Sequence, residues 1–157
     1  MTIIETLDTL KEYLAEELKE YVVYDKDMQS YPLNFFSGTL PRKTSDTTGS
    51  SYYPAIMVLS LGGDVGVTDS TLSVRVVMLI HDDGVGDGCR EIYNLSEKVR
   101  RILTQSTIIG DGITLNFPLK WENSVDTNWP IWLAWFDFTV NIRWENAPLD
   151  QWYKKRR

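Results

Sequence analysis

The stretch from Trp129 to Glu145 constrains the fold more than any other part of the chain. Between positions 132 and 144 every even-numbered residue is apolar (Trp132, Ala134, Phe136, Phe138, Val140, Ile142 and Trp144), and the odd-numbered residues turn polar from Asp137 onward. This two-residue period is typical of a β-strand, whose successive side chains point to opposite faces of a sheet. Such a strand would extend about 40 Å, roughly twice the usual length. We therefore expect it to bend at a bulge or to project at one end toward another molecule.

A second alternating stretch runs from Thr71 to His81, with Leu72, Val74, Val76, Met78 and Ile80 on one face and Ser73, Arg75, Val77, Leu79 and His81 on the other. It follows a branched apolar run from Ala55 to Leu61, which we expect to end at the Gly62-Gly63 pair. The short connection predicts that these two strands are antiparallel neighbours. A shorter strand is predicted from Ile113 to Phe117, followed by a loop from Trp121 to Pro130.

Two segments show the apolar period of a helix. The first has its stripe at Ile3, Leu7, Leu10, Leu14, Leu18 and Tyr21, with a capping box formed by Thr2 and Glu5. The second, from Cys89 to Gln105, has its stripe at Ile92, Leu95, Val99, Ile102 and Leu103, with Asp87 as its N-cap and Glu97 four residues before Arg101. The predicted fold class is α+β: a mostly antiparallel sheet with two amphipathic helices packed on one face.

The whole chain, residues 1–157, is predicted to be a single domain with one long irregular loop at about residues 25–53. This loop contains two prolines, two glycines and a run of Ser, Thr and Lys, and it includes a possible short strand from Leu33 to Phe36. Long loops without regular structure are usually functional or disordered. We expect this one to become ordered against a partner, and Arg42 and Lys43 are its candidate contact residues.

Composition excludes several classes of function. The formal net charge of -6 argues against non-specific binding to nucleic acid, because phosphate contacts need clustered Lys and Arg. A single Cys excludes an internal disulfide framework and a Cys-rich zinc site. No apolar run approaches the ~20 residues needed to span a bilayer, and the amphipathic N-terminus does not resemble a signal peptide. We expect a chain that is synthesised in the cytoplasm and has no membrane partner.

The Gly-rich turn between Asp82 and Gly88 is the first candidate for binding chemistry, because it follows a strand and opens a helix. Its glycine spacing lacks the third glycine of the dinucleotide fingerprint, and its aspartates would repel a phosphate. As a calcium loop begun at Asp83 it would have Val85 at a ligand position and Asn94 in place of the closing Glu. A looser cation site remains an alternative, although a strand-to-helix turn explains the same residues.

His81 and Cys89 flank this turn and would form a base and a thiol nucleophile if they met. The surrounding aspartates disfavour a thiolate, however. The sequence therefore predicts no catalytic residues, no cofactor and no metal site.

An interaction surface is the better candidate. Val77 and Leu79 make the odd-numbered face of their strand partly apolar, and Leu133 and Trp135 do the same for the final strand. If the two strands are neighbours, these four side chains share the sheet face opposite the helices. The long loop, the C-terminal tail or a neighbouring subunit would have to cover them.

The layout of these segments resembles the tail terminator (tail completion) proteins of long-tailed bacteriophages and prophages. The resemblance rests on the N-terminal amphipathic helix, the long polar loop, the segment from Pro54 to Val58 with its hairpin into the next strand, the helix from Ile92 to Leu103, and the aromatic final strand. It implies a non-enzymatic virion protein that forms a ring, commonly a hexamer, on the end of the tail tube. The implied partners are other copies of the chain, the tail tube protein and the head–tail connector, while DNA passes through without specific binding.

Two alternatives stay open. The first keeps the virion but changes the task, to a neck or head–tail connector subunit or another tail component. The second is a small α+β domain that binds a ligand or a cation at the turn between Asp82 and Asp87. The implied location is the virion tail, after assembly in the bacterial cytoplasm.

Overall fold

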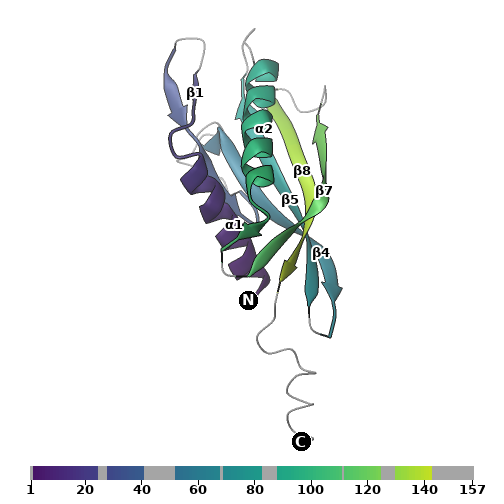
Figure 1. Ribbon diagram of the computed structural model, residues 1–157. Helices are drawn as coiled ribbons and strands as arrows, with labels where there is room; N and C mark the ends of the chain where they lie inside the picture. The colour runs from purple at the N-terminus through teal and green to yellow at the C-terminus, as the bar shows by residue number, and fades with distance from the viewer. Residues whose placement is uncertain are drawn as a thin grey trace, which may run out of the picture.

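The computed structural model describes residues 2–24, 28–40, 52–67, 69–82, 88–110, 112–124 and 130–142 (Figure 1). Arg42, Lys43, the aspartates from 83 to 87 and the tail beyond Ile142 lie outside these ranges. The elements in chain order are α1 (Ile3–Glu17), β1 (Val22–Tyr24), β2 (Ser30–Pro32), β3 (Asn34–Ser37), β4 (Ala55–Val65), β5 (Ser70–His81), α2 (Gly88–Gln105), β6 (Ile108–Ile109), β7 (Ile113–Asn123) and β8 (Ile131–Ile142).

In the described part of the chain, β1 and β2 form a small hairpin and the other strands form a six-stranded sheet in the order β3-β4-β5-β8-β7-β6. Neighbouring strands of this sheet are antiparallel except for β3, which runs parallel to β4. The helices lie side by side on one face, with α1 over β3 and β4 and α2 over β5 and β8 (Figure 1). The predicted α+β fold class is confirmed.

The central pair of strands is β5 and β8. Both have 12 residues, and they pair along their full length, from Ser70 opposite Ile142 to His81 opposite Ile131, without a shift in register. The expectation that the last strand bends or projects is therefore wrong for residues 131–142. An equally long neighbour satisfies its hydrogen bonds on one side, and the irregularity lies instead in β7, between Asn116 and Lys120.

The main core lies between the sheet and the helices, where the apolar stripes meet. The even-numbered residues of β5 and β8 face this core, and Phe136 and Phe138 are 2% and 4% exposed. The helices contribute the stripes predicted from their periodicity: Leu7, Leu10, Leu14 and Leu18 from the first, and Ile92, Leu95, Val99, Ile102 and Leu103 from the second. Only the ends of the first stripe differ, because Ile3 is exposed and Tyr21 only packs against the core's edge.

Local capping fixes where α1 begins. The backbone N–H of Glu5 donates to the Thr2 hydroxyl at 3.1 Å, and the backbone N–H of Thr2 donates to the Glu5 carboxylate at 2.7 Å. This reciprocal pair satisfies two backbone donors that a helix start leaves unpaired. The predicted capping box is confirmed.

Two strands are longer than their sequence patterns indicated. β4 does not end at Gly62-Gly63 but continues to Val65, with a bulge between Ser60 and Gly62. A side chain at Gly63 would place its Cβ 2.1 Å from the Thr71 carbonyl oxygen, so this glycine permits close strand pairing rather than ending the strand. β7 likewise continues to Asn123 because β8 offers pairing partners beyond the predicted end at Phe117.

The segment predicted as an irregular loop contains two short strands. β2 lies at Ser30–Pro32, and β3, close to the possible strand at Leu33–Phe36, joins the edge of the main sheet beside β4. Leu33, between them, is buried in the main core. The possible strand at Leu33–Phe36 is thus found one residue later, at Asn34–Ser37, where it pairs with β4. β2 was not predicted from the sequence, and it pairs with β1 instead.

Candidate interaction face

The sheet face opposite the helices, called the open face below, brings together the four apolar residues singled out by the sequence. Val77 on β5 lies opposite Trp135 on β8, and Leu79 lies opposite Leu133. On the other side of β5, Met57 pairs with Val77, and Ala55 pairs with Leu79. We call these six residues the apolar patch: Ala55, Met57, Val77, Leu79, Leu133 and Trp135. The predicted adjacency is confirmed.

The chain itself covers part of this patch. Val77 and Leu79 are only 8% and 5% exposed, and Phe36, Leu40 and Tyr53 pack against the same cluster. Of the three covers that the sequence left open for Val77 and Leu79, the structure shows the long loop, because residues at the two ends of the segment 41–51 lie against them. Met57 on β4 and Leu133 and Trp135 on β8 are only partly buried, so the accessible area of the patch lies at its two sides and not at its centre on β5.

Trp135 stands at the border between apolar and charged residues. The guanidinium carbon of Arg75 lies 5.3 Å from the centre of the Trp135 ring, within the range of a cation–π contact. Arg75 also donates two hydrogen bonds to Asp137, at 2.7 and 2.9 Å, which raise the pKa of Arg75 above its ordinary value. This fork-to-fork geometry fixes the cation beside the indole ring.

The indole N–H of Trp135 is an unsatisfied hydrogen-bond donor. Its Nε1 is buried and has no hydrogen-bond partner among the described residues. Leaving a buried donor unpaired costs about 1–3 kcal/mol.

Beyond the Arg75–Asp137 pair, the open face becomes polar. The Asn116 amide donates to the Thr139 hydroxyl at 3.2 Å and to the Asn141 carbonyl oxygen at 2.9 Å. The Thr71 hydroxyl donates to the same oxygen of Asn141 at 3.3 Å. The open face therefore has three zones along the strands: an apolar patch, a charge pair and a network of hydroxyl and amide groups.

The residues considered for catalysis are not brought together by any hydrogen bond in the described part of the chain. The His81 ring stacks on Tyr53, with their centres 6.0 Å apart. Cys89 is exposed at the start of α2, where its hydrogen bond with Tyr93 raises the pKa of that phenol. Within the described ranges, no group of three or more His, Cys, Asp or Glu side chains is placed to hold a metal ion. Of the proposed cation turn, Asp82 to Asp87, only Asp82 lies within those ranges, and residues 83–87 lie outside them.

Trp121, which the sequence left hard to place, belongs to the helix side of the sheet. It stacks on Phe136 with ring centres 6.1 Å apart and planes 13° from parallel, yet it remains 48% exposed. The Arg75–Asp137 pair was not predicted from the sequence. It could have been, because the two residues have opposite charges and stand at odd-numbered positions of two strands that were expected to be antiparallel.

Comparisons with known proteins add no relative. The chain matches no protein-family model, and no curated protein matches it. Among its described helices, none is long and apolar enough to cross a membrane. The function is therefore inferred from the sequence and from the surfaces described above.

Proposed function

We propose that the protein is a non-enzymatic structural subunit of a phage or prophage tail, a tail terminator-like ring subunit that caps the tail tube and joins it to the head connector. The observation that carries the proposal is the open face. Its apolar patch ends at a partly buried Trp135 whose indole N–H is unsatisfied. Apolar surface with an aromatic anchor is typical of a protein interface.

The charge of the chain supports this role. A ring on a tail tube surrounds a channel through which DNA moves, and a net charge of -6 disfavours adhesion to phosphates. The resemblance in layout to tail terminators supports it as well. In the assembled tail, the partners would be other copies of the chain, the tube protein and the connector.

The test replaces Trp135 with Ser. Because Trp135 lies at the edge of the patch and not in the main core, the variant is expected to fold, with a circular dichroism spectrum like that of the unaltered protein. Tails assembled with it should grow beyond normal length, as measured by negative-stain microscopy. Asn141→Ala, in the polar zone of the same face, is the matched control and should leave tail length unchanged.

The possible outcomes separate the candidates. A folded Trp135→Ser variant that yields tails of normal length, still joined to heads, would remove the open face from the mechanism. Tails of normal length that fail to join heads would instead indicate a neck or connector subunit.

A further inference from the structure

A ring of identical subunits needs two different surfaces on each subunit. Contacts in which one patch meets its own copy close a dimer, whereas head-to-tail contacts between unlike patches continue around a ring. Large apolar side chains are exposed at several places besides the open face, including the start of α1 and the β1–β2 hairpin. Two of these regions lie at the turn between β4 and β5 and beside α2. Their compositions are complementary.

The first region is the hairpin tip, defined as residues 61–67, 69 and 70 at the turn between β4 and β5. Three aliphatic side chains are exposed there: Leu61 by 49%, Val65 by 75% and Val67 by 56%. Asp64 and Asp69 are exposed beside them, and this segment has no Lys or Arg. A hydrogen bond of 2.9 Å from the Gly66 N–H to the Asp69 carbonyl closes the turn. The tip is therefore an acidic and aliphatic surface of defined shape.

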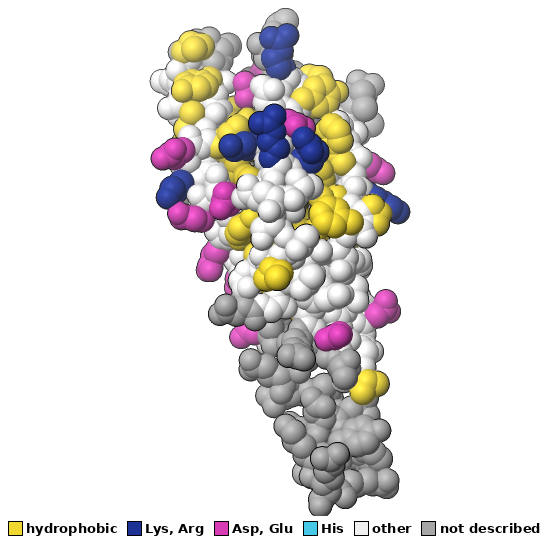
Figure 2. All heavy atoms as spheres, viewed as in Figure 1, with side chains coloured by type: hydrophobic (Ala, Val, Ile, Leu, Met, Phe, Trp, Pro, Cys, Tyr) yellow, Lys and Arg dark blue, Asp and Glu magenta, His cyan; other side chains and the backbone are white. Residues whose placement is uncertain are grey.

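The second region is the aromatic flank, defined as Tyr93, Arg100 and Trp121. α2 lies over β5 and β8 (Figure 1), and β7 beside them is largely exposed from Phe117 onward, although Ile113 and Leu115 at its start are buried. Tyr93 and Arg100 are seven residues apart and so share one side of α2. That side is opposite to Gln105, whose amide donates to the Tyr13 hydroxyl of α1 at 3.3 Å. Figure 2 shows hydrophobic side chains gathered on this side of α2, next to a group of Lys and Arg side chains.

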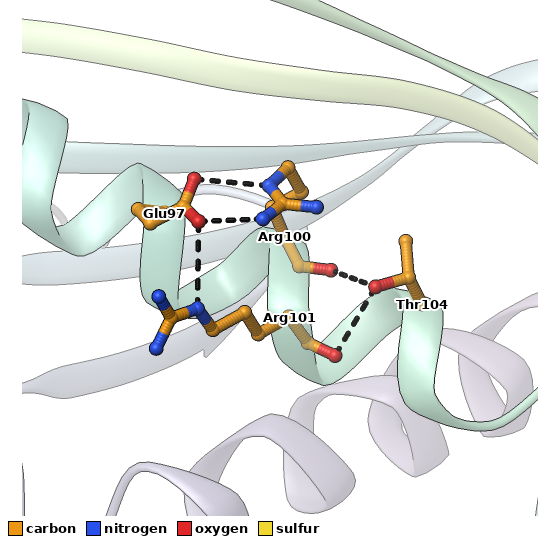
Figure 3. Close-up of polar contacts among 4 residues, drawn as sticks. All are labelled: Glu97, Arg100, Arg101 and Thr104. Atoms are coloured by element: carbon orange, nitrogen blue, oxygen red, sulfur yellow. Dashed lines mark hydrogen bonds and ion pairs between the residues drawn. The ribbon is translucent and has the colours of Figure 1, made fainter.

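The aromatic flank carries a surplus of positive charge. The Glu97 carboxylate accepts from Arg100 at 2.5 and 2.9 Å and lies 3.4 Å from Nε of Arg101, so one acid serves two cations (Figure 3). Over its whole length α2 has four basic residues and two acidic ones, in a chain whose net charge is negative. The excess of positive charge on α2 can therefore attract an acidic surface of a partner.

The hairpin tip cannot cover the aromatic flank of its own chain. Ser70, at the base of the tip, pairs with Ile142 of β8, while Trp121 pairs with Phe136 of the same strand. Positions 136 and 142 are six residues apart along β8, which corresponds to about 20 Å. Contact between tip and flank therefore requires two molecules.

We propose that the hairpin tip of one copy docks on the aromatic flank of the next copy, with Val65 and Val67 against Trp121 and Tyr93, and Asp64 and Asp69 facing Arg100. This head-to-tail contact rests on the proposed ring. It deepens that proposal by naming the two surfaces that meet between neighbouring subunits. Burial of the exposed aromatic rings supplies the contact area, and the opposite charges select the partner.

The test is disulfide trapping between two differently labelled proteins, both with Cys89→Ser to remove the exposed native thiol. One protein has Val65→Cys and the other has Trp121→Cys, and the mixture is oxidised mildly with diamide. The disulfide-linked heterodimer is expected to form at least about tenfold faster than with Ile108→Cys in place of Val65→Cys, because docking raises the local thiol concentration. Ile108 is the matched control, since it is 66% exposed on a strand edge. Equal rates for the two pairs would overturn the proposal.

A second measurement covers the case in which Trp121→Cys unfolds the protein. Tyr93→Cys then replaces it, since Tyr93 is 46% exposed on α2. In addition, a tip variant (Asp64→Lys with Asp69→Lys) and a flank variant (Arg100→Glu) should each give less trapped product. Together in one chain the reversed charges should restore it, and failure of this rescue would also count against the contact.

The outcome is separable from that of the tail assay. Selective trapping between tip and flank, together with normal tails from Trp135→Ser, would keep the contact and refute the role of the open face. Long tails from Trp135→Ser without selective trapping would keep the tail function and refute this contact.

Discussion

Replacing Phe138 with Ala tests the register on which the whole description depends. Phe138 is 4% exposed and lies on the helix-facing side of β8, opposite Val74 of β5. Its removal loses the transfer free energy of a buried aromatic ring and leaves a cavity, so the free energy of unfolding should fall by about 3–5 kcal/mol. For a chain of this length the melting temperature should fall by roughly 10 °C.

The assay is urea denaturation followed by far-ultraviolet circular dichroism, at protein concentrations where the midpoint no longer depends on concentration. Asn141→Ala is the control on the opposite face of the same strand. It removes the hydrogen bonds from Asn116 and Thr71 at an exposed site and should cost about 1 kcal/mol or less. Equal costs for the two variants would refute the reasoning, because a strand slipped by one residue exchanges its faces.

Three further predictions concern charge and close packing. Bonds from Arg100 lower the pKa of Glu97 to about 2 from its ordinary 4.5, so this carboxylate stabilises the fold above pH 4.5 and loses that effect as pH falls toward 2. Glu97→Gln should therefore narrow the stability difference between pH 6 and pH 2 in thermal melts, and an unchanged difference would count against the pair. Burial, with a smaller contribution from Glu91, raises the pKa of Tyr21 to about 12, so ionisation should destabilise the fold between pH 10 and pH 12. Tyr21→Phe should lose less stability over that range than the unaltered chain, as measured by denaturant midpoints. Gly63→Ala forces a Cβ against the Thr71 carbonyl and should lower the free energy of unfolding by about 1–3 kcal/mol. Relative to the unaltered chain, amide exchange should become faster in the β4–β5 hairpin but not in α1.

The elements that could be predicted from sequence are those whose own pattern is long and regular. The alternation of β5 and β8 and the stripes of the helices gave the correct faces, and from those faces followed the adjacency of Val77 and Trp135. The end of β7 was not visible, because it depends on pairing with β8. The possible strand at Leu33–Phe36 corresponds to β3, shifted by one residue through its pairing with β4. The sequence left open which segment covers Val77 and Leu79. The cover comes from Phe36, Leu40 and Tyr53 of the long loop, whose path no local period encodes.

The three zones of the open face also determine where along the strands a partner can lie. A partner displaced by two residues, about 7 Å, would press apolar atoms onto the Arg75–Asp137 pair and strip its water without replacing its hydrogen bonds. Displaced the other way, its polar groups would meet the partly exposed Leu133 and lose their own hydration. Displacement in either direction therefore weakens binding, and the two losses arise on opposite sides of Trp135. If the open face binds a partner as proposed, the order of residues along β8 fixes the axial position of that partner.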